Sequence, residues 1–177
     1  KDVISRVRSH KILKIASPDT HLQNTLSKAL GISKILSQVL INRGIKDTAG
    51  ADKFLNVSTS HLLDPFLFTD MHNAVNLIQK ATKDKSKVMI AGDYDVDGLT
   101  AVALLKEVLS KAGLDVIHYI PHRIKEGYGL NKNTVSFAKQ KGINLLITVD
   151  CGTNNREEIR ELRRSNIEVI VTDHHAS

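Results

Sequence analysis

The stretch that decides the fold is VMIAGDYDVDG, residues 88–98. Its first part, VMIAG, is a short apolar run typical of a buried strand. GDYDVDG, residues 92–98, then places three aspartates at alternate positions before Gly98. The following stretch, LTAVALLKEVLSKA, has the composition and length of a strong helix, and Gly113 ends it. The sequence here therefore predicts a strand, a carboxylate-rich loop and a helix.

The same rhythm continues toward the end of the chain. The predicted strands are DVIHYI, INLLITVD and IEVIVTD, and the predicted helices between them are NTVSFAKQK and REEIRELRRS. Helices between successive strands imply parallel pairing, and continuous apolar strands imply a sheet covered on both faces. We expect an α/β fold with an open parallel sheet and helices on both faces.

The first half of the chain has a different sequence pattern, which predicts short amphipathic helices joined by polar loops. We therefore predict a helical N-terminal region over residues 1–83 and an α/β catalytic domain over residues 84–177, incomplete at its C-terminus.

Composition limits the class of protein. The chain has 177 residues, a formal net charge of +6 and a single cysteine. One cysteine excludes an internal disulfide framework and suits a reducing, cytoplasmic location. No apolar run reaches membrane-spanning length and no signal peptide is recognisable. A basic chain favours polyanionic partners, and the start at Lys1 instead of methionine suggests a fragment.

Polar residues gather where the predicted strands end, which is where sites form in open parallel sheets. The set comprises Asp93, Asp95, Asp97, His122, Arg123, Asp150, Asp173, His174 and His175. Carboxylates with imidazoles suit manganese, iron or zinc, and a carboxylate-rich set with water also accepts magnesium. Divalent cations are the simplest way to keep so many carboxylates ionised together.

A calcium loop and a solvated turn are the alternatives for GDYDVDG. An EF-hand loop that starts at Asp93 requires a bidentate glutamate at its twelfth position, where this chain has Leu104. It also requires a helix before the loop, where this sequence predicts a strand. The other polar strand ends favour a metal site over a solvated turn.

Four motifs in order, GDYDVDG, PHRIKEGYGLN, VDCG and TDHH, resemble the DHH phosphoesterases, and specifically the RecJ-type single-stranded-DNA exonucleases. INRGIKDTAGADKFLN and LLDPFLFTDMHNAV resemble the helical lead-in of that branch. The resemblance implies a two-metal phosphodiesterase that uses two divalent cations, Mn²⁺ or Mg²⁺. It also implies a 5′→3′ exonuclease that releases 5′-mononucleotides from single-stranded DNA in DNA repair and recombination.

Carried over motif by motif, the resemblance assigns metal ligands and catalytic residues. Asp95 and Asp97 each bind a metal, Asp150 bridges the two, His174 completes one coordination shell, and His175 contacts the scissile phosphate. Whether Asp93 ligates a metal or orients water stays open. Asp173 is expected to accept a hydrogen bond from a histidine.

Substrate contacts are expected from the segment after the second predicted strand. Arg123 offers a planar fork for phosphate oxygens, and Lys125 adds charge. Gly127 and Gly129 permit positive φ and close backbone approach. Tyr128 between them either stacks on a base or packs beneath a plain flexible connection.

The chain departs from the family pattern because it ends soon after the histidines, without the later aspartate and the DHH-associated domain. We therefore expect weak or no activity from this chain by itself. Its expected partners are single-stranded DNA and repair or replication proteins, with no membrane and a monomeric state. Two alternatives stay open: a phosphoesterase for oligonucleotides, cyclic dinucleotides or pyrophosphate, and a non-catalytic RecJ-like replication module.

Overall fold

The structure is a computed structural model that describes residues 16–176. It divides into two compact units between Asp64 and Pro65, here named the helical unit and the sheet unit. The helical unit contains α1 (Thr20–Leu30), α2 (Lys34–Asn42), α3 (Thr48–Leu55) and η1 (Thr59–His61). The sheet unit contains η2 (Pro65–Leu67), α4 (Met71–Lys83), β1 (Lys87–Gly92), α5 (Val96–Lys111), β2 (Asp115–Tyr119), α6 (Lys132–Lys141), β3 (Leu145–Val149), α7 (Arg156–Arg164) and β4 (Glu168–Thr172).

The helical unit has a small core of its own, built on Leu26, Leu40 and Ala51. Each of its α-helices begins at a polar residue whose side chain accepts a backbone N–H of the first turn, as helix N-termini require. These N-cap residues are Asp19, Ser33 and Asp47.

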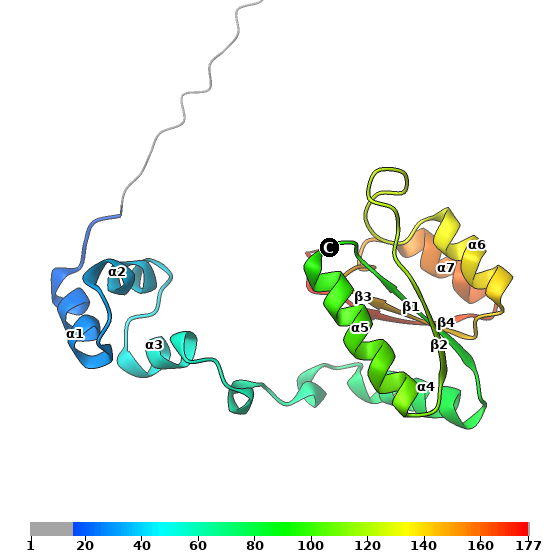
Figure 1. Ribbon diagram of the computed structural model, residues 1–177, viewed down its shortest axis with the longest axis horizontal. Helices are drawn as coiled ribbons and strands as arrows, with labels where there is room; N and C mark the ends of the chain where they lie inside the picture. Colours follow the sequence, from blue (N-terminus) through cyan, green and yellow to red (C-terminus); the bar gives the residue numbers. More distant parts are fainter. Residues whose placement is uncertain (1–15, 177) are drawn as a thin grey trace, which may run out of the picture. The chain divides into compact units, whose positions relative to one another are not determined.

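The sheet unit is built on four parallel strands in the order β2-β1-β3-β4. Successive side chains of a strand point to opposite faces. Val88 and Ile90 of β1 therefore pack with α4 and α5 on one face, whereas Met89 and Ala91 pack with α6 and α7 on the other. Figure 1 shows these two helix pairs on either side of the sheet. The predicted open parallel sheet with helices on both faces is confirmed.

Helix α4 belongs to the sheet unit because Ala74, Leu77 and Ile78 pack on the sheet core, together with the buried Ala81. The compact units thus divide about twenty residues before the position where the change of sequence rhythm placed a domain boundary. The domain limits 1–83 and 84–177 remain a prediction. Within residues 16–176, no helix has both the length and the apolar character to cross a membrane.

Helix ends in the sheet unit set the connections that carry the site. Asp95 caps the start of α5, and Asn131 and Thr134 form a capping box at the start of α6. Gly113 and Gly142 follow α5 and α6 with φ of 86° and 64°, a left-handed conformation that glycine adopts without steric cost. Helices α5 and α6 therefore end at the edge where the next parallel strand begins, and each strand then runs to the same carboxyl edge.

Candidate metal centre

Three strands deliver acidic and histidine side chains to one edge of the sheet. Asp93 directly follows β1, Asp150 directly follows β3, and His174 lies two residues beyond the end of β4. Since the strands are parallel, their carboxyl ends meet at this edge. The predicted convergence of these strand ends is present in the structure.

The side chains form two groups that share one residue. Within each group, every residue offers one ligand atom, and these atoms all lie within 4.8 Å of one another. One group is Asp93, Asp95 and Asp150, and the other is Asp150, His174 and His175. Asp150 belongs to both groups, and its Oδ1 lies 3.0 Å from Nε2 of His174. Such a shared carboxylate between two sets of oxygen and nitrogen ligands suits a pair of divalent cations.

Asp97 completes the constellation on the exposed side. Its Oδ2 lies 3.7 Å from Nε2 of His174, and both side chains are largely exposed. The structure therefore brings together Asp95, Asp97, Asp150 and His174, which the sequence analysis assigned to metal binding, with Asp93, whose role it left open. Their roles as ligands remain a prediction.

Asp93 provides the test of whether a cation fits this site. The residue is only 5 % exposed, and its Oδ1 is buried with no hydrogen-bond partner within residues 16–176. A buried carboxylate oxygen without a donor is costly, and a cation relieves that cost. The chemistry of the neighbouring ligand atoms is that of a Mn²⁺ or Mg²⁺ site, so the donor set fits the expected metals.

The start of α5 is shaped to hold this loop closely. The side chain of Asp95 accepts the N–H of Gly98 at 3.1 Å, which caps the helix. A Cβ atom on Gly98 would lie only 2.5 Å from the backbone oxygen of Asp93. Glycine at position 98 therefore lets the first turn of α5 pack directly against the backbone of a proposed ligand.

Asp150 sits in an unusual backbone conformation at the end of β3. Its φ is 61°, a left-handed value that is uncommon for residues other than glycine but enriched for aspartate. Its N–H donates to the carbonyl of Thr172 at 3.0 Å, which extends the β3–β4 pairing by one residue. The turn thus fixes the carboxylate at the sheet edge.

The charge state of Asp150 reflects its surroundings. Burial raises the pKa of the Asp150 carboxyl, although its hydrogen bond with His174 acts in the opposite direction. The nearby carboxylates of Asp97 and Asp95 raise this pKa further, because like charges disfavour ionisation. A divalent cation at this point would remove both penalties.

Asp173 supports the second histidine. Its Oδ1 lies 2.8 Å from Nδ1 of His175, and its Oδ2 accepts the N–H of Thr153 at 3.0 Å. Burial acts to raise the pKa of Asp173, but hydrogen bonds from His175 and Thr153 outweigh it and lower the pKa. The hydrogen bond to Asp173 raises the pKa of His175 despite some desolvation. The expected hydrogen bond from a histidine to Asp173 is confirmed.

The KEGYGLN segment, residues 125–131, contacts the carboxyl edge of the sheet through Tyr128. The Tyr128 hydroxyl donates to the backbone carbonyl of Asp150 at 3.0 Å and lies 2.9 Å from Nδ1 of His175. Gly127 and Gly129 have φ of 78° and 81°, as their sequence context predicted. Burial, with added repulsion from nearby acids, raises the pKa of Tyr128 to about 12, so its hydroxyl stays protonated.

Of the three cationic or imidazole side chains after β2, Arg123 lies beside the GDYDVDG loop, whereas Lys125 and His122 belong to a local turn. The guanidinium carbon of Arg123 lies 5.1 Å from the ring centroid of Tyr94, which puts this cation beside the GDYDVDG loop. Lys125 is exposed, and its backbone N–H donates to the carbonyl of His122. His122 is engaged in this local turn, where its Nδ1 accepts from the backbone.

Two residues that the sequence analysis did not select hold the KEGYGLN segment in place. Glu126 accepts from the Tyr119 hydroxyl, the His122 N–H and the Asn133 side chain, and Asn155 bonds to Leu130. The sequence signal for Asn155 is only its position before REEIRELRR, which predicts an N-cap. Nothing in the sequence indicates its partner 25 residues away.

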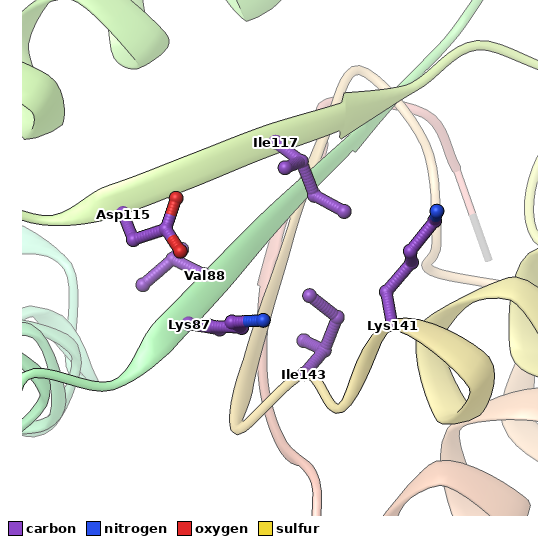
Figure 2. Close-up of a pocket in the computed structure, with 6 residues that line it drawn as sticks. All are labelled: Lys87, Val88, Asp115, Ile117, Lys141 and Ile143. Carbon is purple, nitrogen blue, oxygen red and sulfur yellow. The ribbon is translucent and has the colours of Figure 1, made fainter.

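Two other features lie outside the metal chemistry. Cys151 is buried, and burial raises the pKa of its thiol to about 12, which makes it inert as a nucleophile. A pocket of about 60 Å³ opens at the opposite edge of the sheet, between the starts of β1 and β2 and the end of α6 (Figure 2). It is lined by Lys87, Val88, Asp115, Ile117, Lys141 and Ile143. A single carboxylate between lysines offers no comparable set of metal ligands, so the chemistry is assigned to the carboxyl edge.

Comparison with known proteins agrees with this geometry. Residues 87–177 match the sequence profile described as the DHH family, N-terminal domain. The chain is similar to the single-stranded-DNA-specific exonuclease RecJ of Bacillus subtilis, with 35% identity over 92% of this chain and 21% of that protein. The corresponding RecJ of Thermus thermophilus is 43% identical over 59% of this chain and 16% of that protein.

The solved structures to which this chain is similar are also RecJ proteins. A crystal structure of RecJ from Thermus thermophilus in complex with Mn²⁺ matches with a TM-score of 0.64 and 29% identity, over 92% of this chain and 22% of that one. A crystal structure of exonuclease RecJ bound to manganese matches with a TM-score of 0.55 and 43% identity, over 59% and 27%. The chain thus spans about a fifth of the length of these curated relatives. The profile match covers just over half of the chain and includes every proposed metal ligand; the chain therefore belongs to the DHH family.

Proposed function

We propose that this chain carries the metal centre of a 5′→3′ exonuclease that hydrolyses single-stranded DNA to 5′-mononucleotides in cytoplasmic DNA repair and recombination. The observation that carries the proposal is the convergence of Asp93, Asp95 and Asp150 around a buried carboxylate oxygen that has no donor in the described part of the chain. The single-stranded-DNA-specific RecJ relatives support the choice of substrate, whereas the 5′→3′ polarity is taken from the family resemblance alone.

In the proposed phosphodiester hydrolysis, one set of residues binds the metal ions. Asp93, Asp95, Asp97, Asp150 and His174 would hold two divalent cations, Mn²⁺ or Mg²⁺. When bound, such ions supply Lewis acidity and an activated water at neutral pH. The close packing at Gly98 and the left-handed turn at Asp150 hold these carboxylates in position at the sheet edge.

His175 and Arg123 are the proposed phosphate contacts. Asp173 holds Nδ1 of His175, which leaves Nε2 as the atom available to a phosphate oxygen. The raised pKa of His175 favours the cationic ring that pairs with phosphate. Arg123 sits beside the metal loop through Tyr94, where its planar fork can bind two phosphate oxygens.

The KEGYGLN segment is proposed to meet the strand as it enters. Tyr128 is 44 % exposed, although its hydroxyl is held by the site. A ring fixed at one end and open on the other offers a stacking surface for a base of any identity. The backbone at Gly127 and the exposed charge of Lys125 are the proposed phosphate contacts beside it, whereas Gly129 is buried against Asn155.

The test is metal binding followed by nuclease activity. Titration with Mn²⁺ should show binding that Asp150→Ala abolishes, and any release of 5′-mononucleotides from 5′-labelled single-stranded DNA, expected to be weak for this chain by itself, should depend on Mn²⁺. Rates on long single strands should exceed those on dinucleotides. Absence of Mn²⁺ binding, or preference for dinucleotides, cyclic dinucleotides or pyrophosphate, would contradict the proposal.

A further inference from the structure

Asn155 makes an unusual contact for a residue that begins a helix. It is the N-cap residue of α7, yet its side chain makes no capping hydrogen bond to that helix. N-cap asparagines ordinarily accept a backbone N–H of the first turn. Here the amide faces the KEGYGLN segment, and its contact with α7 is a 3.4 Å hydrogen bond from Nδ2 to the Glu158 side chain, longer than its two bonds to Leu130.

The Asn155 amide pairs with both backbone groups of Leu130. Its Oδ1 accepts the Leu130 N–H at 3.0 Å, and its Nδ2 donates to the Leu130 carbonyl at 2.9 Å. The side chain thereby takes the place that a neighbouring strand would occupy. Leu130 is 3 % exposed and packs in the core beneath α6 and α7, so its backbone groups need protein partners.

The segment is also packed directly against this amide. A Cβ atom on Gly129 would lie 2.6 Å from Oδ1 of Asn155, and the φ of Gly129 is 81°. One residue earlier, Tyr128 donates to the carbonyl of Asp150 and lies beside His175. The contact with Asn155 therefore fixes the chain within two residues of the ring that faces the site.

The other end of Asn155 is tied to the metal strand. Its N–H donates to the carbonyl of Gly152 at 3.0 Å, and Gly152 lies two residues after Asp150. Asn155 thus spans two loops, one that follows β3 with a proposed ligand and one that carries the proposed substrate contacts. Loss of the hydrogen bonds between Asn155 and Leu130 would free Tyr128 without removing any metal ligand.

We propose that Asn155 is a positioning residue that clamps the KEGYGLN segment to the turn after β3 and so holds Tyr128 in place to meet a single-stranded substrate. The clamp is a property of this chain's geometry, whereas its consequence for substrate rests on the proposed function. It separates substrate placement from metal binding, because Asn155 and Leu130 belong to neither group of metal ligands.

The test compares Asn155→Ala with Asn144→Ala in the full chain. Asn144 is a matched control, because its Oδ1 also accepts a distant backbone N–H, that of Lys87 at 2.9 Å, but at the opposite edge of the sheet. In Asn155→Ala, the Leu130 amide should exchange with solvent at least about tenfold faster, the scale set by one lost hydrogen bond. Mn²⁺ affinity should stay within about twofold, since neither group of ligands is altered.

Substrate placement is read from binding of a phosphorothioate oligothymidylate in the presence of Mn²⁺. Asn155→Ala should weaken this binding about tenfold, the loss expected of a misplaced contact, and Asn144→Ala should leave it unchanged. Unchanged exchange at Leu130 would overturn the clamp. Faster exchange with unchanged oligothymidylate affinity, or an equal loss in Asn144→Ala, would overturn the positioning role.

A second pair of variants tests the same contact from its other side. Gly129→Ala places a methyl group against Oδ1 of Asn155 and should also speed exchange at Leu130. If the two residues act through one contact, the double variant should change exchange by less than the product of the two single effects. If the unmodified protein does not bind oligothymidylate, the proposed function fails, while Leu130 exchange in these variants still decides the clamp.

Discussion

Helices α3 and α5 begin with the same local device but in different surroundings. Asp47 accepts the N–H of Gly50 at 2.7 Å in the helical unit, and Asp95 accepts the N–H of Gly98 at 3.1 Å in the sheet unit. Each pair has the spacing Asp-x-x-Gly. Among the described residues, Asp95 has further ligand atoms beside it, those of Asp93 and Asp150, whereas Asp47 belongs to no such group. A capping aspartate therefore becomes a candidate metal ligand only through what the sheet brings next to it.

The largest difference is expected when each cap is neutralised without losing its hydrogen bond. Asparagine caps helices as well as aspartate, so Asp47→Asn should leave stability unchanged to within about 0.5 kcal/mol. Asp95→Asn should likewise keep the fold but lower Mn²⁺ affinity by more than the roughly 10- to 100-fold typical of residues that merely support ligands. Calorimetric titration and thermal unfolding of both variants measure this. Equal Mn²⁺ affinity in the two would remove Asp95 from the ligand set.

The two glycines should respond to alanine with opposite signs. In a helix, Gly→Ala ordinarily stabilises by roughly 0.5–1 kcal/mol, and at Gly50 the added Cβ meets only the flexible end of Asp47 at 3.3 Å. At Gly98 it would lie 2.5 Å from the backbone of Asp93, so overpacking should destabilise by about 1–3 kcal/mol. Chemical denaturation measures both values. Stabilisation by Gly98→Ala would show that the close approach to Asp93 is not constrained.

The ionised carboxylate of Asp150 is unfavourable without a metal, in contrast to the capping carboxylates of Asp47 and Asp95. Its folded-state pKa is raised, chiefly by burial, so its contribution to stability is present at low pH and is lost as pH rises through that pKa. Metal-free Asp150→Asn should therefore be more stable than the unmodified protein at neutral pH, by a smaller amount than the Gly98 effect. The advantage should vanish in acid. Thermal unfolding in EDTA between pH 4 and 8 checks this, and lower stability of the variant at neutral pH would contradict it.

Glu126 should give the smallest effect. Hydrogen bonds from the His122 backbone, Tyr119 and Asn133 lower its pKa, so its contribution is present above its ordinary pKa and is lost as pH falls through the lowered one. Glu126→Gln should reduce stability at neutral pH by less than about 1 kcal/mol, as for other charged contacts that solvent still reaches. Thermal unfolding between pH 3 and 7 should show a flatter profile for the variant. A steeper profile would mean that another group dominates.

The sheet and the edge that carries the site could be predicted because both follow from local pattern. Apolar runs separated by helices specify parallel strands, and parallel strands place the residues after β1, β3 and β4 together. Asp93, Asp150 and His174 are therefore identifiable from the sequence alone. The burial of Asp93 is not, because it depends on the close packing of Gly98 against the Asp93 backbone.

Long-range choices lie beyond the sequence. An amphipathic helix such as α4 has the same pattern whether it packs on other helices or on a sheet, so the pattern does not predict its place in the sheet unit. The bonds from Asn155 to Leu130 and from Tyr128 to the Asp150 carbonyl join segments 25 and 22 residues apart. Side chains of this kind have many equivalent local partners, and only the finished fold selects one.

The parallel order of the strands also has a kinetic consequence. Asp93, Asp150 and His174 come together only after β1, β3 and β4 have paired across their helical crossovers, and such non-local pairing forms late in folding. A cation has no complete set of ligands in the unfolded chain, so it acts by mass action on the finished sheet. Bound metal should thus prolong the lifetime of the native state and leave the rate of refolding almost untouched.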